Sequence, residues 1–241
     1  MTAHVRSAVG AIPWPLWLIG AALILGGCAS SQGLSREALA DVIRQEESQF
    51  LDAPGSGTAP TPLNAPTLGL YLKPTGYLHR EFEWTGRDRD AVLTWSQRVP
   101  LGAGGRSTGF LTASSMRGDT LTELRASAKR YGVDWLLVFD GAAAVDRYNN
   151  YKAGLLYWTI IGAYVADGTQ TDALCLLKAS LWDVKTGTRL FEEQAEARTS
   201  TTGPAALVDD VHEVERARTA AMNVLLERLT KRLPMQAQPG R

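Results

Sequence analysis

The spacing of hydrophobic residues along the chain changes several times, and each spacing predicts a different element. Apolar residues three or four positions apart lie on one face of an α-helix. This spacing predicts helices at residues 35–51, 88–99, 120–131 and 204–233. Short apolar runs bounded by Gly, Pro or Asp predict strands at 68–73, 109–113, 133–139 and 174–184. A turn at Gly187 then predicts that residues 189–199 return as a partner strand.

The order of these elements predicts an α/β fold. The strand at 133–139 is apolar on both faces, which is typical of a central strand covered by helices on both sides. The charges of 189–199 suit the edge of a sheet, because charged edges discourage pairing with another sheet. We therefore expect a single domain at residues 67–235, with a mixed β-sheet covered by helices and a long C-terminal helix. Residues 236–241 are expected to form a polar tail.

The first 27 residues have the layout of an export signal peptide. His4 and Arg6 precede a segment, Ala8 to Gly27, that holds no charged residue. This segment ends in Leu25-Gly26-Gly27-Cys28, which resembles the lipobox of bacterial lipoproteins. The resemblance implies cleavage before Cys28 and attachment of lipid, palmitate included, to this residue.

The alternative for this segment is a transmembrane anchor that is not cleaved, because twenty uncharged residues are just enough to span a bilayer. Pro13 and Pro15 make it a poor helix, and such an anchor has no need of a cysteine at position 28. In the lipoproteins that it resembles, Asp after the lipidated cysteine favours the inner membrane. Ala29 stands there instead, so we expect a protein anchored in the outer membrane by its lipid and facing the periplasm.

Residues 28–66 are interpreted as a lipidated tether. The stretch 52–66 contains four Pro and two Gly among small polar residues, a composition that cannot build a core. Lipidation would leave Cys175 as the one remaining cysteine, so the mature chain forms no internal disulfide. Cys175 stands in an apolar run and is expected to be a small buried side chain.

The chain of 241 residues has 25 basic and 25 acidic residues, and its formal net charge is zero. Proteins that bind nucleic acid usually carry clustered positive charge, so we expect no nucleic-acid partner. Catalytic patterns are also missing. His212-Glu213 begins an HExxH motif, but Arg216 stands where the second His is needed. Asp140 and Asp146 could face one site, but a lone pair of carboxylates without a further pattern is usually solvated. We predict no metal, no cofactor other than the covalent lipid on Cys28, and no enzymatic activity.

Two segments carry a resemblance to a known group of proteins. RASAKRYGVDWLLVFDG (125–141) and LCLLKASLWDVKTGTRLFE (174–192) resemble small envelope lipoproteins. That group includes the curli secretion lipoprotein CsgG and the peptidoglycan synthase activator LpoB, and the resemblance implies a CsgG/LpoB-like periplasmic α/β domain. The chain has no pair of long amphipathic hairpins of the kind that a CsgG-type pore needs, which argues against a channel.

An apolar insert separates the strands at 133–139 and 174–184. Residues 153–166 carry no charge and are too few to span a bilayer. Aromatic residues that are typical of membrane interfaces and binding surfaces lie in or beside it: Tyr148, Tyr151, Tyr157, Trp158 and Tyr164. One interpretation is a hairpin or helix that packs on the sheet of its own domain. The other is an exposed surface for contact with a membrane, a protein partner or a second copy.

The function predicted from these observations is that of a non-catalytic protein-binding or assembly module of the cell envelope. Its expected partners are the membrane, through the lipid anchor, and either another envelope protein or a second copy. Three alternatives stay open: a subunit of a secretion or export assembly, an uncharacterised cell-envelope hydrolase, and a structural or stress lipoprotein.

Overall fold

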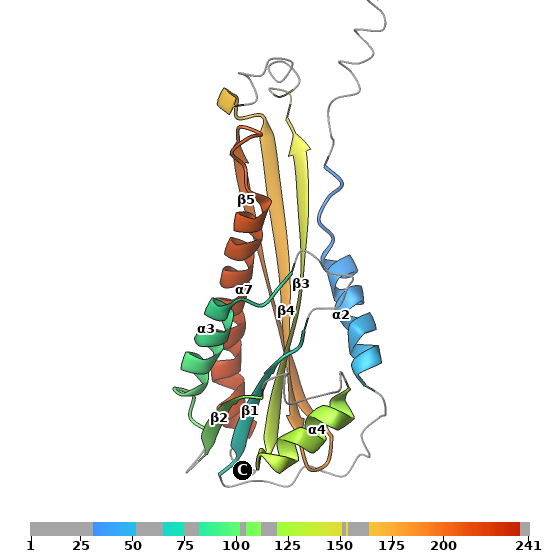
Figure 1. Ribbon diagram of the computed structural model, residues 1–241, viewed down its shortest axis with the longest axis vertical. Coiled ribbons are helices and arrows are strands. Elements are labelled where there is room, and N and C mark those ends of the chain that lie inside the picture. Colours follow the sequence, from blue (N-terminus) through green and yellow to red (C-terminus); the bar gives the residue numbers. More distant parts are fainter. Residues whose placement is uncertain are drawn as a thin grey trace, which may run out of the picture. The chain divides into compact units, whose positions relative to one another are not determined.

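The computed structural model describes residues 31–51, 65–74, 82–101, 105–111, 120–150, 153 and 164–236. Its elements in chain order are α2 (Arg36–Phe50), β1 (Thr67–Leu72), α3 (Gly86–Ser96), β2 (Arg106–Phe110), α4 (Leu121–Arg130), β3 (Trp135–Asn149), β4 (Thr169–Asp183), β5 (Arg189–Gly203) and α7 (Asp210–Gln236) (Figure 1). The described residues fall into two compact units. One contains residues of Arg147–Gln170 and Thr202–Val208, and the larger one contains residues of Gln32–Asp146, Thr171–Thr201 and Asp209–Arg241.

The strands form one five-stranded sheet in the order β2-β1-β3-β4-β5. β1 runs parallel to both of its neighbours, and Leu70 stands beside Leu137 of β3. The amide of Val184, after β4, donates to the carbonyl of Asp134, before β3, at 2.9 Å. The end of β4 therefore meets the start of β3, and these two strands are antiparallel. The predicted mixed sheet, the edge position of β5 and the long C-terminal helix are confirmed.

In the larger unit, α3 and α7 cover one face of the sheet (Figure 1). Alternate residues of β4 point to this face, because side chains of a strand alternate between its two sides. From Ala173 to Leu181 this row is entirely apolar: Ala173, Cys175, Leu177, Ala179 and Leu181. They belong to one buried cluster with apolar residues of α7, including Ala217, Ala221, Leu225 and Leu229. This cluster is the main core of the protein.

A buried ion pair joins the two helices on this face. Arg218 interrupts the apolar stripe of α7, yet its side chain is 7% exposed, and its Nε lies 3.0 Å from Oδ2 of Asp88 on α3. Its Nη1 also donates to the carbonyl of Glu83 at 2.8 Å. Asp88 in turn accepts the amide hydrogen of Thr85, which caps the N-terminus of α3. The break in the hydrophobic pattern is therefore a cross-link between α3 and α7.

The opposite face of the sheet is covered by α4 and α2 (Figure 1). Leu121, Leu124 and Ala128 of α4 belong to a second buried cluster with Leu136, Val138 and Trp182 of the sheet. A third cluster combines Leu39 and Ile43 of α2 with Ala142, Leu174 and Leu176. Phe50 of α2 also belongs to the second cluster, so the two helices share an apolar contact on this face.

Strand β3 extends ten residues beyond the predicted end at 139, to Asn149. The prediction covered only the strongly apolar run, whereas Gly141 and the alanines that follow have low strand propensity. In the structure, Gly141 is required by packing, since a Cβ at this position would come within 2.4 Å of Phe82 and 2.7 Å of Leu177. Tertiary packing therefore compensates for weak local preference.

Other element boundaries also differ from the predicted ones. β2 spans 106–110 rather than 109–113, of which residues 112 and 113 lie outside the described part. The predicted start of the last helix, Pro204, is followed by a turn, and α7 begins at Asp210. The predicted caps of α4 are confirmed, with Thr120 at its N-terminus and Gly132, at a φ of 66°, after its end.

We predict that Arg218→Met lowers the free energy of unfolding by about 3 kcal/mol, because it leaves the Asp88 carboxylate buried without its cation. Arg87 provides a matched control, since it joins the same two helices through Glu215 but has a side chain that is 87% exposed. Arg87→Met should cost less than about 1 kcal/mol. Urea denaturation of the wild-type protein and the two variants measures the free energy of unfolding. Equal losses of this free energy in both variants would contradict the buried Arg218–Asp88 pair as the main cross-link.

Candidate functional site

Helix α2 forms locally and packs on the sheet. Ser35 caps its N-terminus by accepting the amide hydrogen of Ala38 at 3.2 Å. Leu39, Ile43 and Phe50 are buried, so the helix predicted within the tether is confirmed. The sequence placed this helix in a spacer, whereas the structure places residues 36–50 in the larger folded unit. The spacer composition is confined to the segment between α2 and β1.

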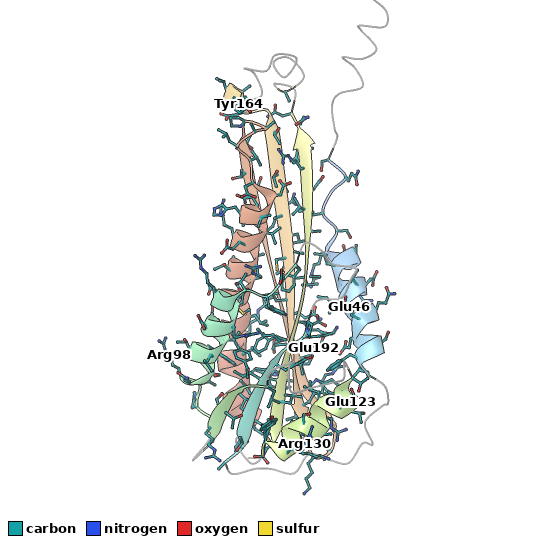
Figure 2. All side chains as sticks on the ribbon, viewed as in Figure 1. Glu46, Arg98, Glu123, Arg130, Tyr164 and Glu192 are labelled. Atoms are coloured by element: carbon teal, nitrogen blue, oxygen red, sulfur yellow. The ribbon has the colours of Figure 1, made fainter. Side chains whose placement is uncertain are left out.

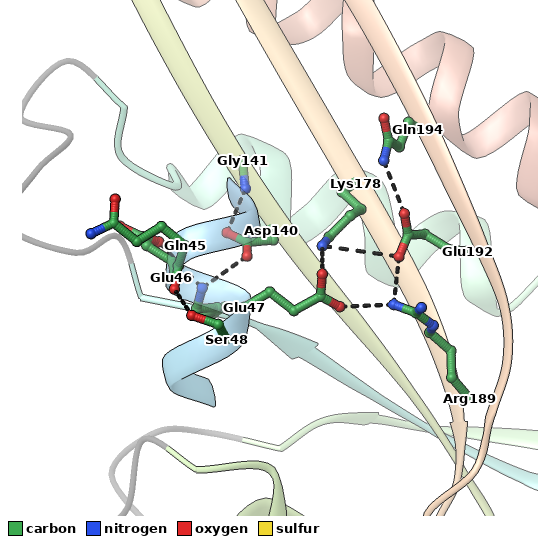
Figure 3. A network of polar contacts seen from close by, with 11 residues as sticks. Gln45, Glu46, Glu47, Ser48, Asp140, Gly141, Lys178, Arg189, Glu192 and Gln194 are labelled. Atoms are coloured by element: carbon green, nitrogen blue, oxygen red, sulfur yellow. Dashed lines mark hydrogen bonds and ion pairs between the residues drawn. The ribbon is translucent and has the colours of Figure 1, made fainter. Parts of the chain in front are cut away.

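A buried lysine on the sheet holds α2 by an ion pair (Figure 3). The side chain of Lys178, on β4, is 5% exposed, and its Nζ lies 2.7 Å from Oε2 of Glu47 on α2. Glu192 of β5 is 4.0 Å from the same Nζ. Arg189 contacts the other oxygen of Glu47 at 2.9 Å and Glu192 at 2.8 Å. The four side chains alternate in charge and connect α2 with both strands.

A second ion-pair group lies beside the first (Figure 3). Nζ of Lys73, just after β1, lies 2.8 Å from Oδ2 of Asp140 on β3 and 3.2 Å from Oε2 of Glu46 on α2. The amide of Gly141 donates to the other oxygen of Asp140 at 2.9 Å. Burial raises the pKa of Asp140, and the nearby Lys73 ammonium offsets part of this rise.

A cleft of about 360 Å³ opens beside these ion pairs. Its lining combines apolar residues with charges of both signs: Arg36, Glu37, Ala40, Ile43, Arg44, Glu47, Leu176, Lys178, Arg189, Glu192 and Gln194. These side chains offer ion pairs, amide hydrogen bonds and an apolar contact. Such a combination of charged, amide and apolar groups suits binding.

The structure does not bring Asp140 and Asp146 together, so they do not face one site. The two residues lie six positions apart on β3, which corresponds to about 20 Å along a strand. Asp140 pairs with Lys73, whereas Asp146 accepts amide hydrogens of Gln32 and Gly33 at 3.3 and 2.8 Å. Each carboxylate serves a separate local contact.

The apolar insert is described only in part. Tyr164 is 59% exposed and Val165 is 72% exposed. Tyr164 is labelled in Figure 2. Ala153 is buried, and Tyr148 is half-buried. Other predicted site residues lie outside the described residues: Leu25, Gly26, Gly27, Cys28, Tyr151, Tyr157 and Trp158. Buried Ala153 favours an insert that packs on its own domain, whereas exposed Tyr164 favours an insert that forms a contact surface.

Cys175 is buried, as predicted, and its burial raises the pKa of its thiol to about 12. The thiol therefore stays protonated at neutral pH, which suits a packing role. Among the residues described, no three His, Cys, Asp or Glu side chains gather into a group that could hold a metal ion. No helix within the described ranges is long and apolar enough to cross a membrane.

Sequence reasoning missed the contacts of Lys178, Glu46 and Glu47, although the sequence holds a signal for them. Lys178 is the one charged residue in an apolar run, 173–182, that was predicted to be a strand. A lysine in a covered strand requires a carboxylate partner, because an unpaired buried charge is very costly. Glu46 and Glu47 follow Ile43 by three and four positions, which places them on the apolar face of the helix.

Comparisons with known proteins give distant structural likenesses. No protein-family model and no curated protein matches the chain. The PelC dodecamer from Paraburkholderia phytofirmans aligns with 14% identity over 76% of this chain and 96% of that chain, with a TM-score of 0.34. A minor lipoprotein from Acinetobacter baumannii aligns with 14% identity over 74% of this chain and 100% of that chain, with a TM-score of 0.35. Lipoprotein GNA1162 from Neisseria meningitidis aligns with 12% identity over 68% of this chain and 99% of that chain, with a TM-score of 0.32. We transfer neither fold nor function from TM-scores this low.

We predict that the stability cost of burying Asp140 depends on pH. A raised pKa means that the folded protein binds the proton more tightly than the unfolded chain. The contribution of Asp140 to the free energy of unfolding is therefore most favourable below its ordinary pKa of 3.8. This contribution is lost as the pH rises through the raised pKa of the folded protein. Relative to Asp140→Asn, the wild-type protein should become less stable as the pH rises from 3.8 through the raised pKa of Asp140. Urea denaturation across this range measures the difference, and a constant or opposite difference would contradict the prediction.

Proposed function

We propose that this protein is a lipid-anchored lipoprotein of the bacterial outer membrane that faces the periplasm. The observation that carries the proposal is the sequence Leu25-Gly26-Gly27-Cys28 at the end of an uncharged apolar segment. Two or more acyl chains hold a protein stably on a membrane, at about 0.8 kcal/mol for each buried CH₂ group. Ala29 supports the outer membrane as the destination.

The domain that follows acts as a non-catalytic module for protein binding or assembly. Supporting this role, the buried charges beside the cleft pair with one another and connect α2 with the sheet. The described thiol, Cys175, is buried in the core. Anchoring confines such a module to a thin layer at the membrane and thereby raises its effective concentration for partners in that layer.

The contact surface in this proposal is the insert between β3 and β4. Tyr164 and Val165 support it, because both apolar side chains are largely exposed. Tyrosine is enriched at protein interfaces, where its ring packs and its hydroxyl group stays hydrogen-bonded. The partner is another envelope protein or a second copy of this chain.

Metabolic labelling with a palmitate analogue tests the anchor. We expect label on the wild-type protein and on Cys175→Ala, because Cys175 is buried in the core. Cys28→Ala should carry none, because it lacks the thiol that is acylated. Mass spectrometry of the wild-type N-terminal peptide should show acylated Cys28 as the first residue. An intact leader or an unmodified thiol at Cys28 would overturn the anchor.

Photo-cross-linking in intact envelopes tests the contact surface. Tyr164→Asp should reduce the cross-linked adduct about tenfold, because it places a charge where an apolar contact forms. Tyr131, which is 57% exposed on another element, provides the matched control, and Tyr131→Asp should leave the adduct unchanged. Equal adduct yields in both variants and the wild-type protein would contradict the insert as the contact surface.

A further inference from the structure

The face of the sheet beneath α2 differs from the face beneath α7. On the α7 side, the alternate residues of β4 from Ala173 to Leu181 are all apolar. On the α2 side, Lys178 and Ser180 of β4 and Asp140 of β3 are buried polar residues, 4%, 5% and 6% exposed. Once α2 leaves, Lys178 and Asp140 regain water, and this hydration recovers part of the cost of separating the ion pairs. The α2 side is therefore suited to reversible docking.

The connection between α2 and the sheet leaves the helix room to move to another molecule. Sixteen residues, 51–66, separate Phe50 from Thr67, and most of them have the Pro/Gly-rich spacer composition. At about 3.3 Å per residue, a segment of this length can span roughly 50 Å. This distance is larger than the diameter of a small domain, so the segment can reach a neighbouring molecule.

We propose that the surface beneath α2, which we call the α2 surface and define by Lys73, Asp140, Leu176, Lys178 and Arg189, is a docking site for the α2 of a second copy of this chain. α2 is then an exchangeable helix that links anchored copies. The proposal rests on the self-association part of the proposed function and names the segment through which copies associate.

Charge complementarity supports this occupant. The α2 surface offers three cations, Lys73, Lys178 and Arg189, and α2 brings Glu46 and Glu47 to them. The apolar residues of α2 add a contact with Leu174 and Leu176. A second copy carries the same helix, so it makes the same contacts, and exchange of identical elements is a low-cost route to assembly. Confinement at a membrane favours exchange by raising the local concentration of copies.

The experiment measures binding of a fluorescent peptide with the sequence of residues 33–51 to the full chain in mild detergent. Glu47→Lys in the chain places like charges against Lys178 and Arg189, so it should release the chain's own α2 and leave the α2 surface vacant. We expect the peptide to bind this variant saturably. A peptide with the same Glu47→Lys change should bind at least tenfold more weakly.

The control variant is Asp41→Lys, which makes the same change of charge on an outer position of α2. Asp41 pairs with Arg44 on the helix surface, and its side chain is 66% exposed. This variant should keep its own α2 docked, so it should bind the peptide at least tenfold more weakly than Glu47→Lys. Hydrogen exchange should show loss of protection in α2 of Glu47→Lys alone, with β4 protected in both variants.

Three results would overturn the proposal: protected α2 amides in Glu47→Lys, loss of its whole cooperative fold, or equal binding of the two peptides. The first two mean that α2 is an inseparable part of the fold, and the third means that the α2 surface does not recognise this helix. The readout does not involve lipid, so failure of the anchor and failure of helix exchange are distinguishable.

Discussion

The burial of one lysine determines how the second face of the sheet is covered. Lys178 lies on β4, between β3 and β5, and its side chain is 5% exposed. A buried ammonium group requires a carboxylate, and Glu47 of α2 provides it at 2.7 Å. This requirement places Glu47, and with it α2, over Lys178. The second lysine, Lys73, adds the same constraint through Glu46.

This arrangement separates stability from association in the protein that we propose. The α7 face holds the main apolar core and the buried Arg218–Asp88 pair, so it supports the fold permanently. The α2 face combines a smaller apolar cluster with charged side chains that water hydrates when they are exposed. α2 also lies close in sequence to Cys28, the residue that we propose carries the lipid. Movement of α2 would therefore change the length of chain between membrane and domain.

Hydrophobic periodicity was sufficient to predict the α/β class, the mixed sheet and the C-terminal helix, because these depend on which faces of each element are apolar. It did not predict the length of β3, where Gly141 is required by contacts with Phe82 and Leu177. Nor did it predict the partners of Arg218 and Lys178. The sequence marks both as charges in apolar surroundings, but their nearest carboxylates, Asp88 and Glu47, lie 130 or more positions away and are brought near only by the fold.

A double-mutant cycle on Glu47 and Lys178 tests most directly whether this ion pair holds α2 on the sheet. Urea denaturation of the wild-type protein, Glu47→Gln, Lys178→Met and the double variant gives the coupling free energy between the two side chains. We predict a favourable coupling of more than about 1 kcal/mol, because each single change leaves a buried charge without its main partner. Additive losses, with a coupling below about 0.5 kcal/mol, would contradict this account of how α2 docks.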